Sequence, residues 1–293
     1  MALAALHDLP APAKLNLFLH VIGRRADGYH LLQSPFVMID WCDTLHLERR
    51  DDGRLQRHDH GAQLPPDDLC LRAARLLKSE SGCALGADIH IDKRLPAGAG
   101  MGGGSSDAAT VLLGLNQLWG LQWPRSRLLA IGARLGADVP FFIGGHNAFV
   151  EGIGEQLTPI TLPQQWYAVV KPAASLPTAE IFTHEALTRD TEPVIVEGSL
   201  DDARRMLAWS SGWGRNDLQP PAEDRCAEVA QAARWLEARY GNSRMTGSGS
   251  AVFARAGTGD VPVATLPVQQ LAPGWEGRMC RSLTQHPLAG WAV

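Results

Sequence analysis

The residues of this chain with the clearest chemical potential form a run of glycines followed by two serines. Five glycines fall within residues 98–104, and Ser105 and Ser106 follow directly. Glycine adopts positive φ values and lets another group approach the backbone closely. Unpaired N–H groups at the start of a helix attract anions, because the helix dipole favours negative charge there. The run therefore predicts a phosphate-binding loop. The alternative is a plain turn, which needs only one or two glycines.

Familiar nucleotide-binding patterns fit this loop poorly. Gly98, Gly100 and Gly103 satisfy G-x-G-x-x-G, but a dinucleotide-binding loop should follow a buried parallel strand and precede an acidic residue about 20 positions on. Residues 87–93 instead alternate polar and apolar types, and no Asp or Glu occurs in residues 109–136. No Gly-Lys-Ser/Thr closes the loop, and the protein-kinase motifs are absent. A Rossmann oxidoreductase is therefore a poor fit.

The segment after the loop predicts the helix that would present these N–H groups. Its apolar residues fall on one helical face, namely Val111, Leu112, Leu115, Leu118 and Trp119. Ser105 or Ser106 is expected to cap this helix, and Asp107 is expected in its first turn. Gly103 is expected to need a positive φ or a close approach to phosphate.

Lys14 and Asn16 form a second candidate pair. They lie two residues apart in an alternating segment, so both side chains should leave one face of a strand, opposite Leu15 and Leu17. On the pattern alone, a solvated strand face is the simpler interpretation. In a cleft, the ammonium group of Lys14 would need an anionic partner, either Asp138 or a phosphate.

Asp138 is expected at a corner between a helix and a strand. A helix over residues 125–135 should stop at Gly136, while Pro140 prevents helical continuation and biases Val139 toward an extended conformation. The carboxylate would then lie near the negative end of the helix dipole, where it is not locally stabilised. An Asx turn is the alternative interpretation.

Several segments together indicate a known group of enzymes. The loop resembles the phosphate loop of the GHMP kinase superfamily, and the resemblance extends from about Pro12 to Phe253. The other matching segments are Pro12-Ala13-Lys14-Leu15-Asn16-Leu17, Arg25-Ala26-Asp27-Gly28-Tyr29-His30, Gly136-Ala137-Asp138-Val139-Pro140 and Arg244-Met245-Thr246-Gly247-Ser248-Gly249-Ser250. The Gly-Tyr-His segment resembles the branch that phosphorylates the 2-hydroxyl of a cytidine-diphosphate-linked methylerythritol in non-mevalonate isoprenoid precursor biosynthesis.

Strands alternating with helices, without an internal repeat, predict an α+β fold. The resemblance implies two domains with the active site in the cleft between them. Residues 1–158 would form the ATP-binding GHMP-kinase domain. Residues 159–293 would form a ferredoxin-like, substrate-binding domain.

The resemblance also implies the roles of the reacting groups. Asp138 would be the general base that accepts a proton from the substrate hydroxyl, and Lys14 would be the charged neighbour that keeps this carboxylate ionised. ATP would be the co-substrate, with a Mg²⁺ ion that Ser105 or Ser106 could reach. The residues expected to bind ATP are Pro96, Ala97, Gly98, Ala99, Gly100, Met101, Gly102, Gly103, Gly104, Ser105, Ser106 and Asp68.

For the alcohol substrate, the resemblance implies that Tyr29 stacks on cytosine and that His30 hydrogen-bonds to the base. Without it, hairpin packing and a surface histidine are the simpler interpretations. A second glycine loop around Thr246 and Gly247 would close on phosphates. The expected substrate-binding residues are Asn16, Tyr29, His30, Thr178, Phe182, Thr246 and Gly247.

One position departs from the family. Asp68 stands where these kinases usually have Asn, at a position expected near adenine. A carboxylate accepts hydrogen bonds but does not donate them, so adenine recognition should differ here. Lys14 and Asp138 are both present. Their presence argues against a non-catalytic nucleotide-binding homologue. A kinase for another small alcohol, of the homoserine or mevalonate type, is the nearer alternative.

The composition of the 293 residues, 45% hydrophobic and 20% charged, is that of a globular protein. A net charge of −4 without a basic run argues against a nucleic-acid partner. The five cysteines lack a C-x-x-C pair, and no signal peptide or membrane-spanning run is evident, so a cytoplasmic protein is expected. His58 and His60 suggest a solvated loop rather than a metal site. The oligomeric state is left open.

The remaining elements are expected as follows. Residues 51–68 should be the least structured segment, and residues 147–157 a hairpin. Strands are expected over 36–47, 87–93, 167–171, 250–254 and 278–283. Helices are expected over 67–78, 125–135, 199–209 and 222–240.

Overall fold

A strand of 21 residues, β3 (His30–Arg50), organises the first half of the chain. The computed structural model describes residues 3–194, 206, 208–209 and 211–292. β3 pairs antiparallel with four other strands of a seven-stranded sheet. The others are β1 (Ala5–Asn16), β2 (His20–Arg24), β4 (Leu55–His60), β5 (Gly86–Asp92), β6 (Ala148–Glu151) and β7 (Gln156–Pro159). The expected hairpin is confirmed, because β6 and β7 pair antiparallel.

β4 corrects one expectation, since residues 51–68 are not simply a polar loop. β4 pairs in parallel with β5, with His58 opposite His90. Polar side chains on both strands concealed this edge strand, because the alternation of apolar residues that marks a half-buried strand is missing.

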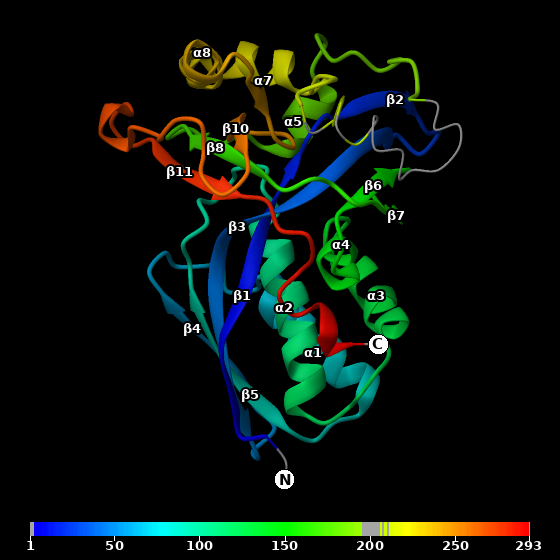
Figure 1. Ribbon diagram of the computed structural model, residues 1–293. Helices are drawn as coiled ribbons and strands as arrows, with labels where there is room; N and C mark the ends of the chain where they lie inside the picture. Colours follow the sequence, from blue (N-terminus) through cyan, green and yellow to red (C-terminus); the bar gives the residue numbers. More distant parts are fainter. Residues whose placement is uncertain (1–2, 195–205, 207, 210, 293) are drawn as a thin grey trace.

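Helices cover one face of this sheet (Figure 1). They are α1 (Leu69–Ser81), α2 (Gly103–Leu118), α3 (Arg125–Ala133) and α4 (Val139–Gly144). α2 packs against β1, β3, α1 and α4, and almost every residue from Ser106 to Leu118 is buried. The expectation of one apolar face is therefore too narrow. α2 is a central helix, which explains why Thr110 and Asn116 are also buried.

The second half of the chain builds a four-stranded antiparallel sheet in the order β11-β8-β10-β9. Its strands are β8 (Gln165–Lys171), β9 (Arg244–Met245), β10 (Val252–Thr258) and β11 (Glu276–Arg281). α8 (Ala227–Tyr240) packs on this sheet beside α7 (Gln219–Arg225), while α5 (Thr178–Thr183) lies near β2 (Figure 1). Short 3₁₀ turns occur at Val268–Gln270 and Ala289–Trp291. The α+β class is confirmed.

The prediction of a single helix over residues 222–240 is wrong near its start, because two helices occupy this range. Cys226 has an extended backbone, with φ −145° and ψ 101°, and separates α7 from α8. α8 then ends at Gly241, as predicted, with φ 69°. The helix expected over 199–209 falls mostly outside the described residues. In the described part of the chain, no helix is long and apolar enough to cross a membrane.

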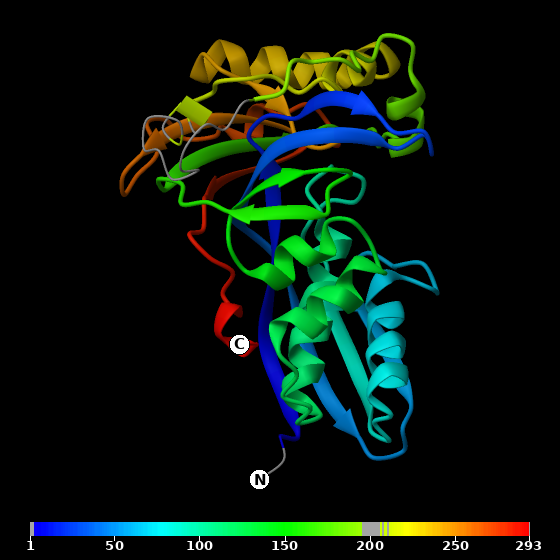
Figure 2. The ribbon, with the colours of Figure 1, turned by 90° about the vertical axis from the view of Figure 1, so that its right-hand side faces the viewer.

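The two sheets adjoin each other (Figure 2), and a shared hydrophobic core joins them. Leu15 and Phe18 from the first half pack in one cluster with Tyr167 and Phe253 from the second. The division expected between residues 158 and 159 falls within β7, one residue before that strand ends. The C-terminal segment returns to the first sheet, where Gln117 Nε2 donates to Trp291 O at 2.5 Å. The two halves are therefore joined by this shared core, and the C-terminal segment adds a contact to the first half.

Candidate active site

The glycine-rich loop runs from the end of β5 to the start of α2. Gly98, Gly100 and Gly102 have φ values of 60°, 72° and 71°, so the predicted conformational demand is confirmed at these three positions. Gly103 is the first residue of α2 and has no positive φ, so that alternative is wrong there, and a close approach of phosphate stays a prediction. The left-handed residue that starts the helix is Gly102.

Close packing explains why Gly102 carries no side chain. A Cβ atom there would lie 3.1 Å from the Phe142 ring and 3.3 Å from Cγ of Lys14. Backbone bonds hold the loop on both sides, from Lys14 N to Met101 O at 2.9 Å and from Ala251 N to Ala99 O at 3.1 Å. The loop is thus fixed between the two halves of the molecule.

One side of the loop faces a cavity of about 510 Å³. The expected ATP-binding residues from Pro96 to Ser105 line it, together with Asp68, Leu64 and Arg72. Ser106 does not line it and is fully buried, and its hydroxyl is unpartnered among the described residues. Neither serine caps α2, because the helix starts at Gly103, before both of them. Of the two candidate magnesium ligands, Ser105 is the one at the cavity.

Asp68 lies at the rim of this cavity as the N-cap of α1. Its carboxylate accepts hydrogen bonds from Cys70 N and Leu71 N, both at 3.1 Å. Arg57 Nη1 on β4 pairs with the same carboxylate at 2.6 Å. The acidic side chain is therefore stabilised by the helix start and by a cation.

A buried ionic cluster beneath the loop was not anticipated. Asp107 lies beyond the first turn of α2, where Lys93 Nζ donates to its Oδ2 at 2.8 Å. Lys93 also donates to Asp43, whose other carboxylate oxygen accepts from Arg94 N and Leu95 N. Burial raises the pKa of Asp107, with Lys93 opposing it and Asp43 reinforcing it. This cluster anchors both ends of the loop.

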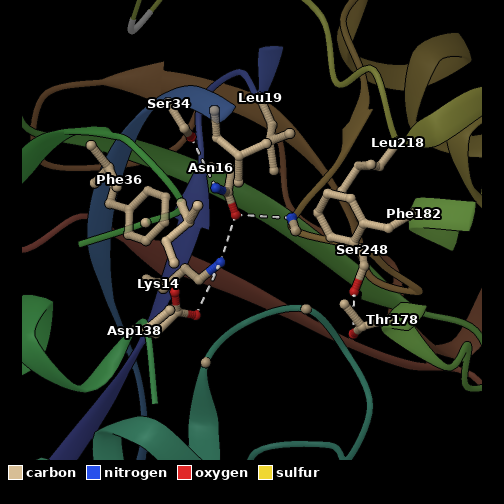
Figure 3. A pocket seen from close by; sticks show the side chains of 18 residues that line it. Lys14, Asn16, Leu19, Ser34, Phe36, Asp138, Thr178, Phe182, Leu218 and Ser248 are labelled. Atoms are coloured by element: carbon tan, nitrogen blue, oxygen red, sulfur yellow. Dashed lines mark hydrogen bonds and ion pairs between the residues drawn. The ribbon is translucent and has the colours of Figure 1, made fainter. Parts of the chain in front are cut away.

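The other side of the loop faces a second cavity, of about 280 Å³ (Figure 3). Gly100 and Gly102 line both cavities. Among the residues expected to react or to bind substrate, this cavity is lined by Lys14, Asn16, Asp138, Thr178, Phe182 and Gly247. The two cavities therefore meet at the glycine loop, with the Lys14–Asp138 pair on one side.

Lys14 and Asp138 form an ion pair, with Nζ 3.7 Å from Oδ2 (Figure 3). Lys14 also donates to Asn16 Oδ1 at 2.6 Å, which confirms that both side chains leave the same face of β1. The Lys14 side chain is 4% exposed, whereas Asp138 is 28% exposed and can be reached from the cavity. Burial lowers the pKa of Lys14 from its usual range, and Asp138 opposes that shift.

The backbone around Asp138 differs from the expected corner. Asp138 is helical, with φ −83° and ψ −14°, and it precedes α4 instead of a strand. Pro140 lies in the first turn of α4, where proline is tolerated because its missing N–H has no intrahelical partner. The carboxylate thus lies at the positive end of a helix, where negative charge is stabilised.

Asn16, at the end of β1, holds the second glycine loop in place. Its Oδ1 accepts from Gly247 N at 2.9 Å and from Thr246 Oγ1 at 3.2 Å. Asn216, which the sequence did not single out, donates to Met245 O and Gly247 O at 2.8 Å. A Cβ on Gly100 would lie 2.3 Å from Thr246 O, so the two loops are in direct contact.

Neither Tyr29 nor His30 lines the second cavity, but His30 contacts a residue that does. Tyr29 follows the turn at Gly28 and is 60% exposed. The His30 ring lies 5.1 Å from the Phe182 ring, centroid to centroid, and Phe182 does line the cavity. Thr178 Oγ1 and Ser248 Oγ, from two residues that line this cavity, are 2.7 Å apart (Figure 3).

The environment of His58 and His60 is not the isolated loop that was expected. Both lie on β4, where His58 contacts Asp88 at 2.9 Å and His60 contacts His90 at 3.2 Å. Strand pairing brings His90 close, which sequence spacing could not show. Even so, no group of three or more metal-ligating side chains among the described residues could hold a metal ion.

Family comparisons agree with this arrangement. Residues 68–146 match the family described as GHMP kinases N terminal domain, and residues 191–264 match GHMP kinases C terminal. A 4-diphosphocytidyl-2-C-methyl-D-erythritol kinase from Methylibium petroleiphilum is 63% identical over the full length of both chains. One from Ralstonia nicotianae is 55% identical over 98% of each chain.

Solved structures show the same relationship. A crystal structure of 4-(cytidine 5'-diphospho)-2C-methyl-D-erythritol kinase is 35% identical, with a TM-score of 0.73, covering 85% of this chain and 90% of its own. The homoserine kinase from Cytophaga hutchinsonii shares only the fold, at 16% identity, with a TM-score of 0.64 and coverage of 97% and 96%. This chain is therefore a small-molecule kinase that belongs to the 4-diphosphocytidyl-2-C-methyl-D-erythritol kinase family within the GHMP kinases.

Proposed function

We propose that this enzyme transfers the γ-phosphoryl group of ATP to the 2-hydroxyl of 4-diphosphocytidyl-2-C-methyl-D-erythritol, in the non-mevalonate route to isoprenoid precursors. The observation that carries the proposal is the meeting of two cavities at Gly100 and Gly102, with Lys14 and Asp138 on the side away from Asp68. One cavity suits a nucleotide and the other an alcohol. The names of the relatives support the choice of alcohol.

In the larger cavity, the N–H groups of Gly103, Gly104 and Ser105 open α2 and would hold the ATP phosphates. Asp68 would lie at the far end, near the base. Its carboxylate is an acceptor, so it would suit the amino group of adenine. Binding through main-chain donors at a helix start needs no cationic side chain in the loop itself.

One residue at the nucleotide cavity, Ser105, could be a ligand of a magnesium ion. Ser105 offers a hydroxyl oxygen at the cavity, whereas the enclosed Ser106 hydroxyl does not. Mg²⁺ commonly keeps waters and phosphate oxygens as most of its ligands, so a single hydroxyl suffices. When bound, the ion neutralises charge that develops on the transferring phosphate.

Asp138 would take the proton of the attacking hydroxyl. The new bond joins the 2-oxygen to the γ-phosphorus, the bond from that phosphorus to the bridging oxygen breaks, and ADP leaves with the electron pair. The exposure of Asp138 lets substrate reach it, and its place at the start of α4 directs the carboxylate into the cavity that Lys14 also lines. Lys14 would orient the carboxylate and stabilise charge on the transferring group.

The cytidine portion would lie between Tyr29 and Phe182, with His30 on its edge. Tyr29 is exposed and free to stack on a base, and Phe182 already contacts the His30 ring. The diphosphate and the erythritol would be held by polar groups that line the smaller cavity or belong to the second glycine loop beside it. These groups are provided by Asn16, Thr178, Thr246 and Gly247.

The decisive assay is ADP release from ATP and Mg²⁺ in the presence and absence of 4-diphosphocytidyl-2-C-methyl-D-erythritol. We expect release that depends on this alcohol, with homoserine and mevalonate giving none above background. Turnover of either comparator in place of the cytidine substrate would contradict the proposed acceptor. Tight ATP binding with no turnover of any alcohol would instead indicate a non-catalytic protein.

A further inference from the structure

Arg189 makes an unusual set of contacts beside the His30 ring. Its guanidinium donates to three main-chain carbonyls, those of Phe182 at 3.2 Å, His184 at 2.8 Å and Leu187 at 3.2 Å. Its Nε–H donates to His30 Nε2 at 3.3 Å. The carbonyls fix the guanidinium, so the direction of the Nε–H group is set by the backbone at the end of α5 and directly after it.

This contact determines which nitrogen of His30 carries the proton. A guanidinium has only donors and stays protonated in proteins, so His30 Nε2 must present its lone pair. In a neutral imidazole the single hydrogen then lies on Nδ1. A histidine without such a neighbour exchanges between the two tautomers.

The charged groups around the His30 ring also favour the neutral imidazole. Burial lowers the pKa of His30, and the cations of Arg189 and Arg24 lower it further. Arg24 lies on β2 opposite His30, and Arg189 follows α5. Among the described residues, these two cations act on the ring, and both disfavour the imidazolium form. His30 is therefore held as a neutral group with one hydrogen to donate.

We propose that Arg189 is a positioning residue that fixes His30 as an Nδ1–H donor toward the acceptor edge of a pyrimidine base. The inference rests on the proposed function, in which His30 meets cytosine. Cytosine offers its N3 and O2 atoms as acceptors, whereas N3 of uracil carries a hydrogen, so this tautomer favours cytosine. The same guanidinium holds the carbonyl of Phe182, whose ring contacts His30. Arg189 thus joins two sides of one base site.

The first test uses the ligand-free protein and nitrogen-15 NMR of the imidazole groups, with His30→Gln to assign the signals. We expect the His30 proton on Nδ1 at pH 7.5 in the wild type. In Arg189→Gln we expect a substantial fraction of the Nε2–H form. A wild-type proton on Nε2, or a tautomer unchanged by Arg189→Gln, overturns the inference whatever the enzyme phosphorylates.

The second test separates positioning from simple support of the fold. In Arg189→Gln, we expect KM for the cytidine substrate at pH 8 to rise about 3- to 10-fold, the range for one neutral hydrogen bond. The kcat and the KM for ATP should stay within about twofold. The KM defect should shrink as the pH falls to 6, because imidazolium carries a hydrogen on both nitrogens and regains the Nδ1 donor. A loss that is the same at every pH contradicts the proposal.

Two further variants keep the test decisive. Arg24→Gln removes a nearby cation whose own Nε–H donates to Gly28 O, so we expect the tautomer and KM to stay near the wild-type values. If Arg189→Gln fails to fold, His30→Asn is compared with His30→Gln, because Asn places its amide near the Nδ1 position. Asn should bind the cytidine substrate more tightly. Equal loss in both variants counts against an Nδ1 donor, whereas no turnover in the wild type counts against the proposed function alone.

Discussion

Lys14 Nζ lies 3.7 Å from Asp138 Oδ2, and the two side chains differ sevenfold in exposure, at 4% and 28%. The cation is enclosed by the protein, and the carboxylate opens to the cavity. A buried ammonium group is costly without an anion, so each group stabilises the charge of the other. This difference in exposure fits a role in which the fixed ammonium group of Lys14 orients the accessible carboxylate of Asp138.

Replacing Asp138 by Asn tests the role of the base. The amide keeps the shape of the side chain but accepts no proton, so we expect kcat to fall by roughly 10²- to 10⁴-fold. Titration calorimetry with a non-hydrolysable ATP analogue should show nearly unchanged affinity, since Asp138 does not line the nucleotide cavity. Asp51→Asn, at a carboxylate that is 80% exposed, is the control. A kcat near that of the wild type would exclude Asp138 as the base, and a loss below tenfold would assign it to positioning.

Replacing Tyr29 by Ala tests the binding of the base. Tyr29 is 60% exposed, so we expect the melting temperature to stay close to that of the wild type. Stacking of a base on an aromatic ring is worth about 1–3 kcal/mol, which predicts a 5- to 150-fold rise in KM for the cytidine substrate. Steady-state kinetics should show an unchanged KM for ATP. An equal loss for both substrates would mean that Tyr29 supports the fold of the site instead of stacking.

The parts of the site that the sequence predicted are those carried by local pattern. The glycine loop, its helix and the shared face of Lys14 and Asn16 depend on residues close together in the chain, so spacing alone defines them. The capping residue was missed because Gly102, in a left-handed conformation, takes the place that Ser105 or Ser106 would occupy. Capping preferences describe side chains that accept hydrogen bonds from the helix start, so they do not predict a helix that begins after a left-handed glycine.

What the sequence could not provide depends on contacts between distant segments. Lys93 directly follows β5, whereas Asp43 lies on β3 and Asp107 on α2, and nothing in their spacing predicts that they meet. Asn216 is another example, because it holds a loop about 30 residues further on. Asp138 is a different case, because the ambiguity there is local: Pro140 is compatible with either a helix start or a strand.

Comparison of Gly102→Ala with Gly104→Ala tests the loop. Gly102 has φ 71°, and an added methyl group would meet the Phe142 ring and Lys14, so we expect this variant to lose stability and most ATP-analogue affinity. Gly104 is helical and has only Leu69 Cδ1, at 3.8 Å, near the added methyl. Melting of the ligand-free proteins should show a lower midpoint for Gly102→Ala only. Affinity of Gly102→Ala within about twofold of the wild type would mean that the loop is not the phosphate site.

Lys93→Met tests the buried cluster beneath the loop. The change leaves Asp43 and Asp107 without their shared cation, and breaking a buried pair in this way typically costs about 3–5 kcal/mol. Asp107→Asn is the matched variant. It removes one of two carboxylates that compete for one cation, so we expect its free energy of unfolding to stay within about 1 kcal/mol of the wild type. Denaturant unfolding at pH 7 measures both.

The pH dependence of stability shows whether Asp107 is protonated or ionised in the folded cluster. Burial and Asp43 raise the pKa of Asp107 in the folded protein, despite Lys93, whereas the unfolded value is about 3.9. The folded state therefore keeps a proton that the unfolded state releases, so this contribution to stability is full below pH 4 and declines as the pH rises through the raised value. Asp107→Asn should remove that decline, which denaturant unfolding from pH 5 to 8 would show as a flatter curve. An unchanged slope, or a cost equal to that of Lys93→Met, would mean that Asp107 is fully ionised and needs its charge.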